Sequence, residues 1–290
     1  MMSTHYFTIA GFTIAVTLPS SADAGRLLPS FRAFRADGVD EGGLLFTLTV
    51  GQTDEPQQMT LLEESENDMG RLRLYATPQG YRVELISGAF THVVSMDRRF
   101  ASATASLRWE DRRAGLVLSS MLRVVYAQAV LARQAVSIHA AAVSCGGKAY
   151  LFMGRSGTGK STHASLWLRH VPGSSLLNDD NPTVRLIDGR AYAYGTPWSG
   201  KLPCYKPVSF PVGGMVRLSQ AADNRFCRCD GVDAFVAIYP GCCVISQDAV
   251  SLGHLHDTLV RLAETVPVGT LDCRPDAGAA VICHRSLAGA

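Results

Sequence analysis

The chain has 290 residues, 47% of them hydrophobic and 18% charged, which is enough to bury a core in one large domain or two small ones. Its 27 basic and 25 acidic residues leave a formal net charge of +2, which argues against a broad basic surface for nucleic acid or an anionic membrane. The 8 cysteines form no C-x-x-C pair, so reduced thiols packed as small apolar groups are favoured over a metal site.

The N-terminal region, residues 1–113, is predicted to be an antiparallel β-rich region. Apolar and polar residues alternate in short runs that Gly, Asp, Pro and Ser separate. These runs are Tyr6–Leu18, Leu44–Val50, Met59–Glu63, Leu72–Ala76, Tyr81–Ile86 and Ala105–Trp109. No Lys or Arg precedes the first apolar residues, so no signal peptide is expected and a cytoplasmic location is predicted.

A helix is predicted at Leu116–Leu131, where apolar residues recur at helical spacing, and it is expected to bridge to the second region, residues 114–290. The apolar stretch around it, Ala114–Ala132, contains Arg123 and several polar residues. It is therefore interpreted as a buried or amphipathic helix and not as a membrane span.

A β-hairpin is predicted next, with strands at Ser137–Val143 and Ala149–Met153 and a turn at Gly146-Gly147. Its second strand leads into a Gly-rich loop and then a helix from Ser161 to about His170. The later elements are predicted as strands at Thr183–Ile187, Ala191–Tyr194, Val212–Leu218 and Val266–Leu271, and as helices at Ala234–Ile238, Leu252–Glu264 and from Gly278 onward.

The loop Gly154-Arg155-Ser156-Gly157-Thr158-Gly159-Lys160-Ser161 fits the Walker A pattern of P-loop proteins and is predicted to bind a nucleoside triphosphate, ATP, with Mg²⁺. Its glycines let backbone N–H groups turn toward the phosphates, and the following helix adds the positive end of its dipole. Lys160 is expected at the β- and γ-phosphate oxygens, with Ser161 as a ligand of Mg²⁺ or, alternatively, Mn²⁺. Ser156, Gly157, Thr158 and Thr162 complete the expected cofactor-binding set. The alternative is a Gly-rich turn with an accidental lysine.

Two adjacent carboxylates, Asp179 and Asp180, follow the run Leu176-Leu177-Asn178. Neighbouring residues of a strand face opposite sides, so both can reach one site only if the strand ends there and the chain turns, which Asn181-Pro182 allows. One carboxylate would then hold Mg²⁺ and the other would take the proton of an attacking hydroxyl. An acidic surface turn is the alternative.

His139 interrupts an apolar run shortly before the P-loop, where a histidine is usually a hydrogen-bonded core residue. In order and spacing, however, His139, the P-loop and Asp179-Asp180 resemble the HPr kinase/phosphorylase family and, more distantly, the ATP-dependent phosphoenolpyruvate carboxykinases. The resemblance spans roughly Ser137 to Lys201 and implies a P-loop core of the α+β or α/β class. It also implies that His139 lies beside the γ-phosphate or the metal.

The chain departs from both families in its substrate-binding segments. It has no counterpart of the Arg-Gly-Leu-Gly signature of the HPr-directed enzymes, so HPr is not the expected substrate. It also lacks the carboxykinase residues that bind oxaloacetate. The segment Gly195-Thr196-Pro197-Trp198-Ser199-Gly200-Lys201 is similar to segments of other kinase-like members of the superfamily, including some near peptide-modification systems. Lys201 would stabilise the transferring phosphoryl group there; a structural turn with Trp198 in the core is the alternative.

The predicted function is an ATP-dependent kinase that transfers the γ-phosphate to a hydroxyl, either a serine of a peptide or protein or a small molecule. Two alternatives stay open: a carboxykinase-like enzyme acting on a keto acid, and a nucleotide sensor without catalysis. Because related kinases assemble as oligomers, a homo-oligomer is also considered.

Overall fold

The computed structural model describes residues 1–39, 42–67 and 69–288. The chain is a mixed α/β protein with two large mixed β-sheets, one in each of two compact units, Met1–Ala129 (unit 1) and Val130–Ala290 (unit 2). The division follows the helix that the sequence predicts, whereas the sequence placed a boundary before it, at Arg113. None of the helices among the described residues is long and apolar enough to cross a membrane.

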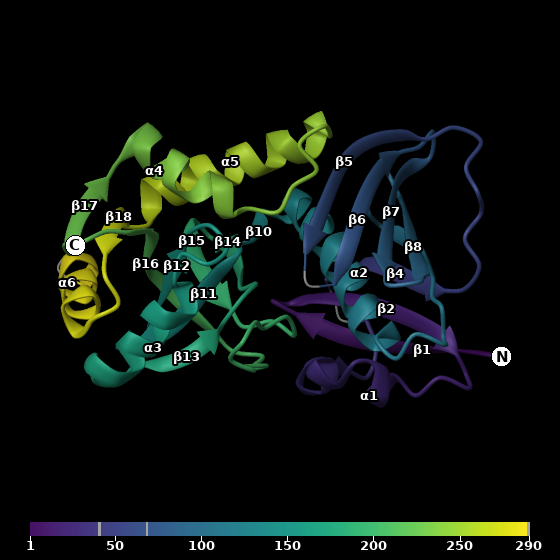
Figure 1. Ribbon diagram of the computed structural model, residues 1–290, viewed down its shortest axis with the longest axis horizontal. Helices are drawn as coiled ribbons and strands as arrows, with labels where there is room; N and C mark the ends of the chain where they lie inside the picture. Colours follow the sequence, from purple (N-terminus) through teal and green to yellow (C-terminus); the bar gives the residue numbers. More distant parts are fainter. Residues whose placement is uncertain (40–41, 68, 289–290) are drawn as a thin grey trace. The chain divides into compact units, whose positions relative to one another are not determined.

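Unit 1 contains a nine-stranded sheet with the strand order β3-β1-β2-β4-β9-β8-β7-β6-β5 (Figure 1). Its elements are β1 (Met2–Ile9), β2 (Phe12–Pro19), α1 (Ala24–Leu27), η1 (Pro29–Phe34), β3 (Arg35–Ala36), β4 (Leu44–Val50), β5 (Thr60–Asn67), β6 (Gly70–Ala76), β7 (Gly80–Ser87), β8 (Phe90–Asp97), β9 (Ser102–Ser106) and α2 (Ala114–Ala129). Helix α2 packs against β4, β8 and β9. It buries Leu118, Leu122 and Val125 completely, which explains the apolar spacing of its sequence.

The expectation of a β-rich N-terminal region is confirmed, and most of its strand pairs are antiparallel. The expectation that the region is antiparallel throughout is wrong, because β4 pairs in parallel with both β2 and β9. The run predicted at Tyr6–Leu18 is two strands, since Ala10 and Gly11 adopt φ values of 51° and 72° and turn the chain into a hairpin. Strand β8 was not predicted. Alternation of side chains identifies a strand but not the strand beside it, which is why the parallel pairs were missed.

Unit 2 contains the second sheet, with the order β10-β14-β15-β16-β12-β11-β13 and with β18 paired to β16 and β17. Its elements are η2 (Leu131–Arg133), β10 (Ala135–Ser137), β11 (Ala140–Cys145), β12 (Lys148–Met153), α3 (Lys160–His170), β13 (Ser175–Asn178), β14 (Thr183–Ile187), β15 (Arg190–Tyr194), β16 (Ser209–Gln220), β17 (Arg225–Cys229), α4 (Gly231–Ile238), η3 (Tyr239–Gly241), α5 (Ala249–Thr265), β18 (Val268–Cys273) and α6 (Ala277–Ala288). Strands β12, β16 and β18 are mutually parallel, and the other pairs are antiparallel.

The sheet of unit 2 lies between two layers of helices (Figure 1). Leu151 and Met153 of β12 face the core formed with α4 and α5, and Phe152 faces the core formed with α3 and α6. This alternation explains why β12 is apolar from Ala149 to Met153, since a strand covered on both faces has no solvent side there. The P-loop therefore begins from a strand that is buried on both faces.

Two elements of unit 2 differ from the sequence-based prediction. The strand expected at Ser137–Val143 is divided into β10 and β11, which pair with different neighbours, because the chain changes partners at Ile138 and His139. Strand β17 was not predicted. The hairpin turn at Gly146-Gly147 is confirmed, with both glycines at positive φ. All 8 cysteines are free thiols.

Candidate functional site

The P-loop connects the end of β12 to the beginning of α3. Gly159 caps α3 in the left-handed conformation, with φ of 107° and no side-chain hydrogen bond to the cap. The first N–H groups of the helix therefore remain available to a ligand, and the helix dipole makes that ligand an anion. Inside the loop, the Thr158 hydroxyl donates to the Arg155 carbonyl at 2.7 Å. From outside, the Gln220 amide of β16 donates to the carbonyls of Gly157 and Thr158.

The Lys160 side chain is folded over its own loop. Its Nζ donates to the carbonyl oxygens of Gly154 at 3.1 Å and Arg155 at 3.3 Å, and the residue is buried. Burial lowers the pKa of the Lys160 ammonium, while the negative charges of Asp180 and Asp179 oppose that shift. Both carboxylates are thus within electrostatic range of the P-loop lysine.

The turn that carries Asp179 and Asp180 is shaped by Asn178, the fully buried last residue of β13. The Asn178 Oδ1 accepts from the backbone N–H groups of Asp180 at 3.0 Å and Asn181 at 2.8 Å. Its Nδ2 lies on the other side of the chain and donates to carbonyl oxygens of Thr196 and Trp198. One side chain therefore holds the carboxylate turn and the Gly195–Lys201 segment together.

Asp179 itself contacts the same segment. Its Oδ2 accepts from the Leu202 N–H at 2.9 Å, while its Oδ1 is shielded from solvent and has no hydrogen-bond partner among the described residues. A Cβ at Gly200 would lie 3.1 Å from Oδ2, so only glycine leaves this approach open without a shift of its neighbours. Lys201 lies in the chain between Gly200 and Leu202, the two residues that approach Asp179, and its side chain is exposed. Trp198 of the same segment is buried.

His139 lies at the break between β10 and β11, and its Nε2 is 3.5 Å from Asp180 Oδ1. Backbone hydrogen bonds fix this arrangement on both sides: Ile138 donates to the Pro182 carbonyl and Ala140 donates to the Asp180 carbonyl. The His139 side chain is 42% exposed and that of Asp180 is 25% exposed. The pair is therefore open to a ligand, unlike the hydrogen-bonded core histidine that is usual in an apolar strand.

The residues present fit a magnesium ion held partly by its substrate. No group of three or more His, Cys, Asp or Glu side chains gathers into a metal site within the described parts of the chain. Mg²⁺ usually takes only one or two carboxylates and keeps phosphate oxygens and water as its other ligands. The Oδ1 of Asp179, which has no hydrogen-bond partner among the described residues, is an oxygen of the required kind, and Ser161 is the second residue of α3.

A cavity of about 440 Å³ adjoins the P-loop where β16 and β18 end. Leu166, Leu218 and Pro275 provide apolar walls, and His163 and Gln220 provide polar edges. In open α/β sheets, ligands bind at the carboxyl ends of the parallel strands, which is where this cavity lies.

The structure brings His139, Lys160, Asp179 and Asp180 together, with the backbone of the Lys201 segment beside Asp179. Sequence reasoning missed Asn178 and Gln220. The only signal for Asn178 was its position immediately before two aspartates at the end of an apolar run, and Gln220 gave none.

Asn178→Ala is expected to destabilise the fold by about 3 kcal/mol, because it leaves several buried backbone groups without partners. Asn178→Asp keeps the acceptor for the turn but places a carboxylate against the Thr196 and Trp198 carbonyls. Its turnover should fall much more than its ATP affinity, since the P-loop itself is untouched. Chemical unfolding and steady-state kinetics measure the two effects, and unchanged turnover in folded Asn178→Asp would contradict the positioning role.

No protein-family model matches the chain, and no curated protein matches its sequence. Among solved structures, the HPr(Ser) kinase/phosphatase from Coxiella burnetii is similar to it, with 11% sequence identity and a TM-score of 0.33. The alignment covers 53% of this chain and 88% of that chain. This is a distant structural resemblance over about half of the chain, and the geometry of the site supports a function independently of it.

Proposed function

We propose that this chain is an ATP-dependent kinase that transfers the γ-phosphate to a hydroxyl of a peptide, a protein or a small molecule. The observation that supports this most is the meeting of Lys160, Asp179, Asp180 and His139 at one P-loop. A protein that only binds a nucleotide, without catalysis, needs the loop and one metal ligand. A second, accessible carboxylate beside a histidine provides what proton removal from an acceptor requires.

In this proposal the P-loop N–H groups and Lys160 bind the β- and γ-phosphates. The acceptor oxygen bonds to the γ-phosphorus, the bond from that phosphorus to the β–γ bridging oxygen breaks, and ADP leaves. Asp180 takes the hydroxyl proton, because it is the more exposed carboxylate, and His139 orients it. Asp179 and Ser161 would hold Mg²⁺, which neutralises charge on the phosphates.

Two further parts of the site complete the proposal. The exposed Lys201 would contact the transferring phosphoryl group and stabilise its negative charge, as an arginine finger does in other phosphoryl-transfer enzymes. The cavity beside β16 and β18 lies next to the P-loop and would hold the nucleobase between its apolar walls.

The test is an incubation of the purified chain with Mg²⁺, ATP labelled in its γ-phosphate, and a panel of serine-containing peptides and small hydroxyl compounds. The proposal expects label in an acceptor hydroxyl, identified by mass spectrometry as a phosphate ester. If the label were released only as inorganic phosphate, the chain would be a hydrolase and the kinase proposal would be rejected. Tight ATP binding without any product would support a sensor, and turnover with oxaloacetate alone would support a carboxykinase-like enzyme.

A further inference from the structure

One face of the unit 1 sheet carries polar side chains in register across five strands. Residues paired directly across neighbouring strands point to the same face. The row consists of Thr49 of β4, Thr104 of β9, Ser95 of β8, Arg82 of β7 and Tyr75 of β6. The opposite face is apolar and belongs to the core, with Val83 and Val94 buried. The polar face is therefore not needed for packing against α2.

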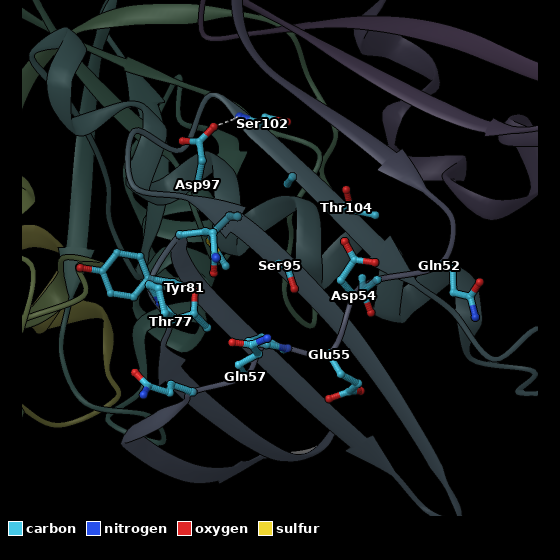
Figure 2. Close-up of a pocket in the computed structure, with 17 residues that line it drawn as sticks. Gln52, Asp54, Glu55, Gln57, Thr77, Tyr81, Ser95, Asp97, Ser102 and Thr104 are labelled. Atoms are coloured by element: carbon cyan, nitrogen blue, oxygen red, sulfur yellow. Dashed lines mark hydrogen bonds between the residues drawn. The ribbon is translucent and has the colours of Figure 1, made fainter.

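The connection between β4 and β5, residues 51–59, is held over this polar row by Arg82. The Arg82 guanidinium donates to the Asp54 carbonyl at 3.1 Å and pairs with Glu55 at 2.9 Å, and the residue is only 2% exposed. A buried guanidinium is costly unless such partners stay in place, so the connection is tied to the sheet. A pocket of about 790 Å³ lies between this connection and the sheet (Figure 2), and its volume is typical of ligand sites.

The acidic groups of this pocket are not equivalent. Asp97 accepts from the backbone N–H groups of Arg99, Ala101 and Ser102 and therefore shapes its own turn. Glu55 is engaged by Arg82. Only Asp54 keeps a carboxylate without a hydrogen bond or an ion pair to any described residue, although its carbonyl holds Arg82.

Neutral polar side chains line the pocket beside Asp54. Figure 2 shows this carboxylate turned toward Thr104, with Ser95 also facing the pocket. The Ser95 hydroxyl is shielded from water and has no hydrogen-bond partner in the described structure. Glutamine side chains, such as those of Gln52 and Gln57, add carbonyl oxygens at the rim. Among the described residues that line the pocket, none is Lys, Arg or His.

We propose that this pocket binds a basic peptide segment, with a lysine or arginine side chain seated against Asp54. Such side chains carry only hydrogen-bond donors, which match the acceptor-only carboxylate of Asp54 and the oxygens of the neutral side chains beside it. Phosphates and acidic peptides would be repelled by the unpaired Asp54. Among the described residues that line the pocket, the one aromatic side chain is Tyr81, which is 5% exposed and stacks on Phe100 with a ring separation of 5.6 Å, so it offers no free face to a sugar. This inference does not depend on the proposed kinase activity.

The test measures fluorescence anisotropy of a labelled peptide of alternating arginine and alanine, titrated with the full chain in the absence of nucleotide. Saturable binding is expected. Asp54→Asn keeps the shape of the side chain and should weaken binding about tenfold, the equivalent of one charged hydrogen bond. Thr104→Val should weaken peptide binding about threefold, the effect of losing one hydrogen bond between neutral groups. Glu63→Gln, on the exposed strand β5 outside the pocket, should leave the affinity unchanged and serves as the matched control.

Several results would overturn the proposal. Equal binding of a peptide with glutamine in place of arginine would show that charge is not recognised. An equal loss in Glu63→Gln would indicate a diffuse effect of acidic surface instead of a site. Displacement of the peptide by maltotriose would assign the pocket to a neutral sugar, and no saturation at millimolar peptide would reject a peptide site.

Discussion

Lys160→Ala is expected to weaken ATP binding about a hundredfold or more, since in the proposed complex this buried cation would provide two or more charge-assisted hydrogen bonds to the phosphates. Nζ now occupies positions beside the carbonyls of Gly154 and Arg155, close to where the phosphates would bind. Removing it also removes the tie between helix α3 and the start of the loop. Isothermal titration calorimetry with ATP and Mg²⁺ measures the change.

A matched control for this variant is Lys148→Ala. Lys148 is the exposed first residue of β12, so its replacement removes the same charge from the same strand-loop unit without touching the phosphate site. Thermal unfolding checks that both variants are folded. If Lys160→Ala bound ATP with the affinity of the wild-type chain, the loop would not be the phosphate-binding site.

Asp180→Asn is expected to lower the turnover number about a hundredfold to ten-thousandfold, the usual contribution of a general base, with ATP affinity changed only a few-fold. The replacement preserves shape, and the backbone contacts of the turn with Asn178 and Ala140 remain. It removes only the negative charge that faces His139 and the ability to accept a proton. Steady-state kinetics with a saturating acceptor measures the effect.

Two other variants separate proton transfer from general effects of charge. Asp188→Asn alters a carboxylate in the β14–β15 turn, where a φ of 48° suits asparagine equally well, and it should keep wild-type turnover. Asp179→Asn should instead raise the Mg²⁺ concentration needed for half-maximal rate, because Asp179 is the proposed metal ligand. Wild-type turnover in folded Asp180→Asn would remove the general base from the mechanism.

The strand, loop and helix that carry the Walker A sequence could be predicted because their requirements are local. The loop needs glycines where the backbone turns, a lysine at the start of the helix and a strand in front of the loop. All of these are adjacent in the chain, and β12 and α3 form as expected. The same is true of the β11–β12 hairpin, whose turn needs two residues at positive φ and has two glycines.

Features that depend on distant segments could not be predicted. The parallel pairs around β4 join strands separated by long connections, and no local pattern specifies such partners. In the site, Asn178 matters because of the carbonyls of Thr196 and Trp198, and Gly200 matters because of Asp179. Both roles exist only once β13 and the Gly195–Lys201 segment lie side by side.

Strand β16 has a consequence for the order of folding. Its first part pairs with β15, and its later part pairs in parallel with β12 and with β18, so it joins segments from most of unit 2. Parallel pairs of this kind close long stretches of chain and form slowly. The Gln220 support of the P-loop is at the far end of this strand and forms only after those pairs are in register. A nascent or partly unfolded chain would therefore hold the whole Walker A sequence without the Gln220 contact to its loop. If the chain binds ATP as proposed, we expect binding to strengthen only once folding of unit 2 is complete, so that nucleotide binding would report completed folding.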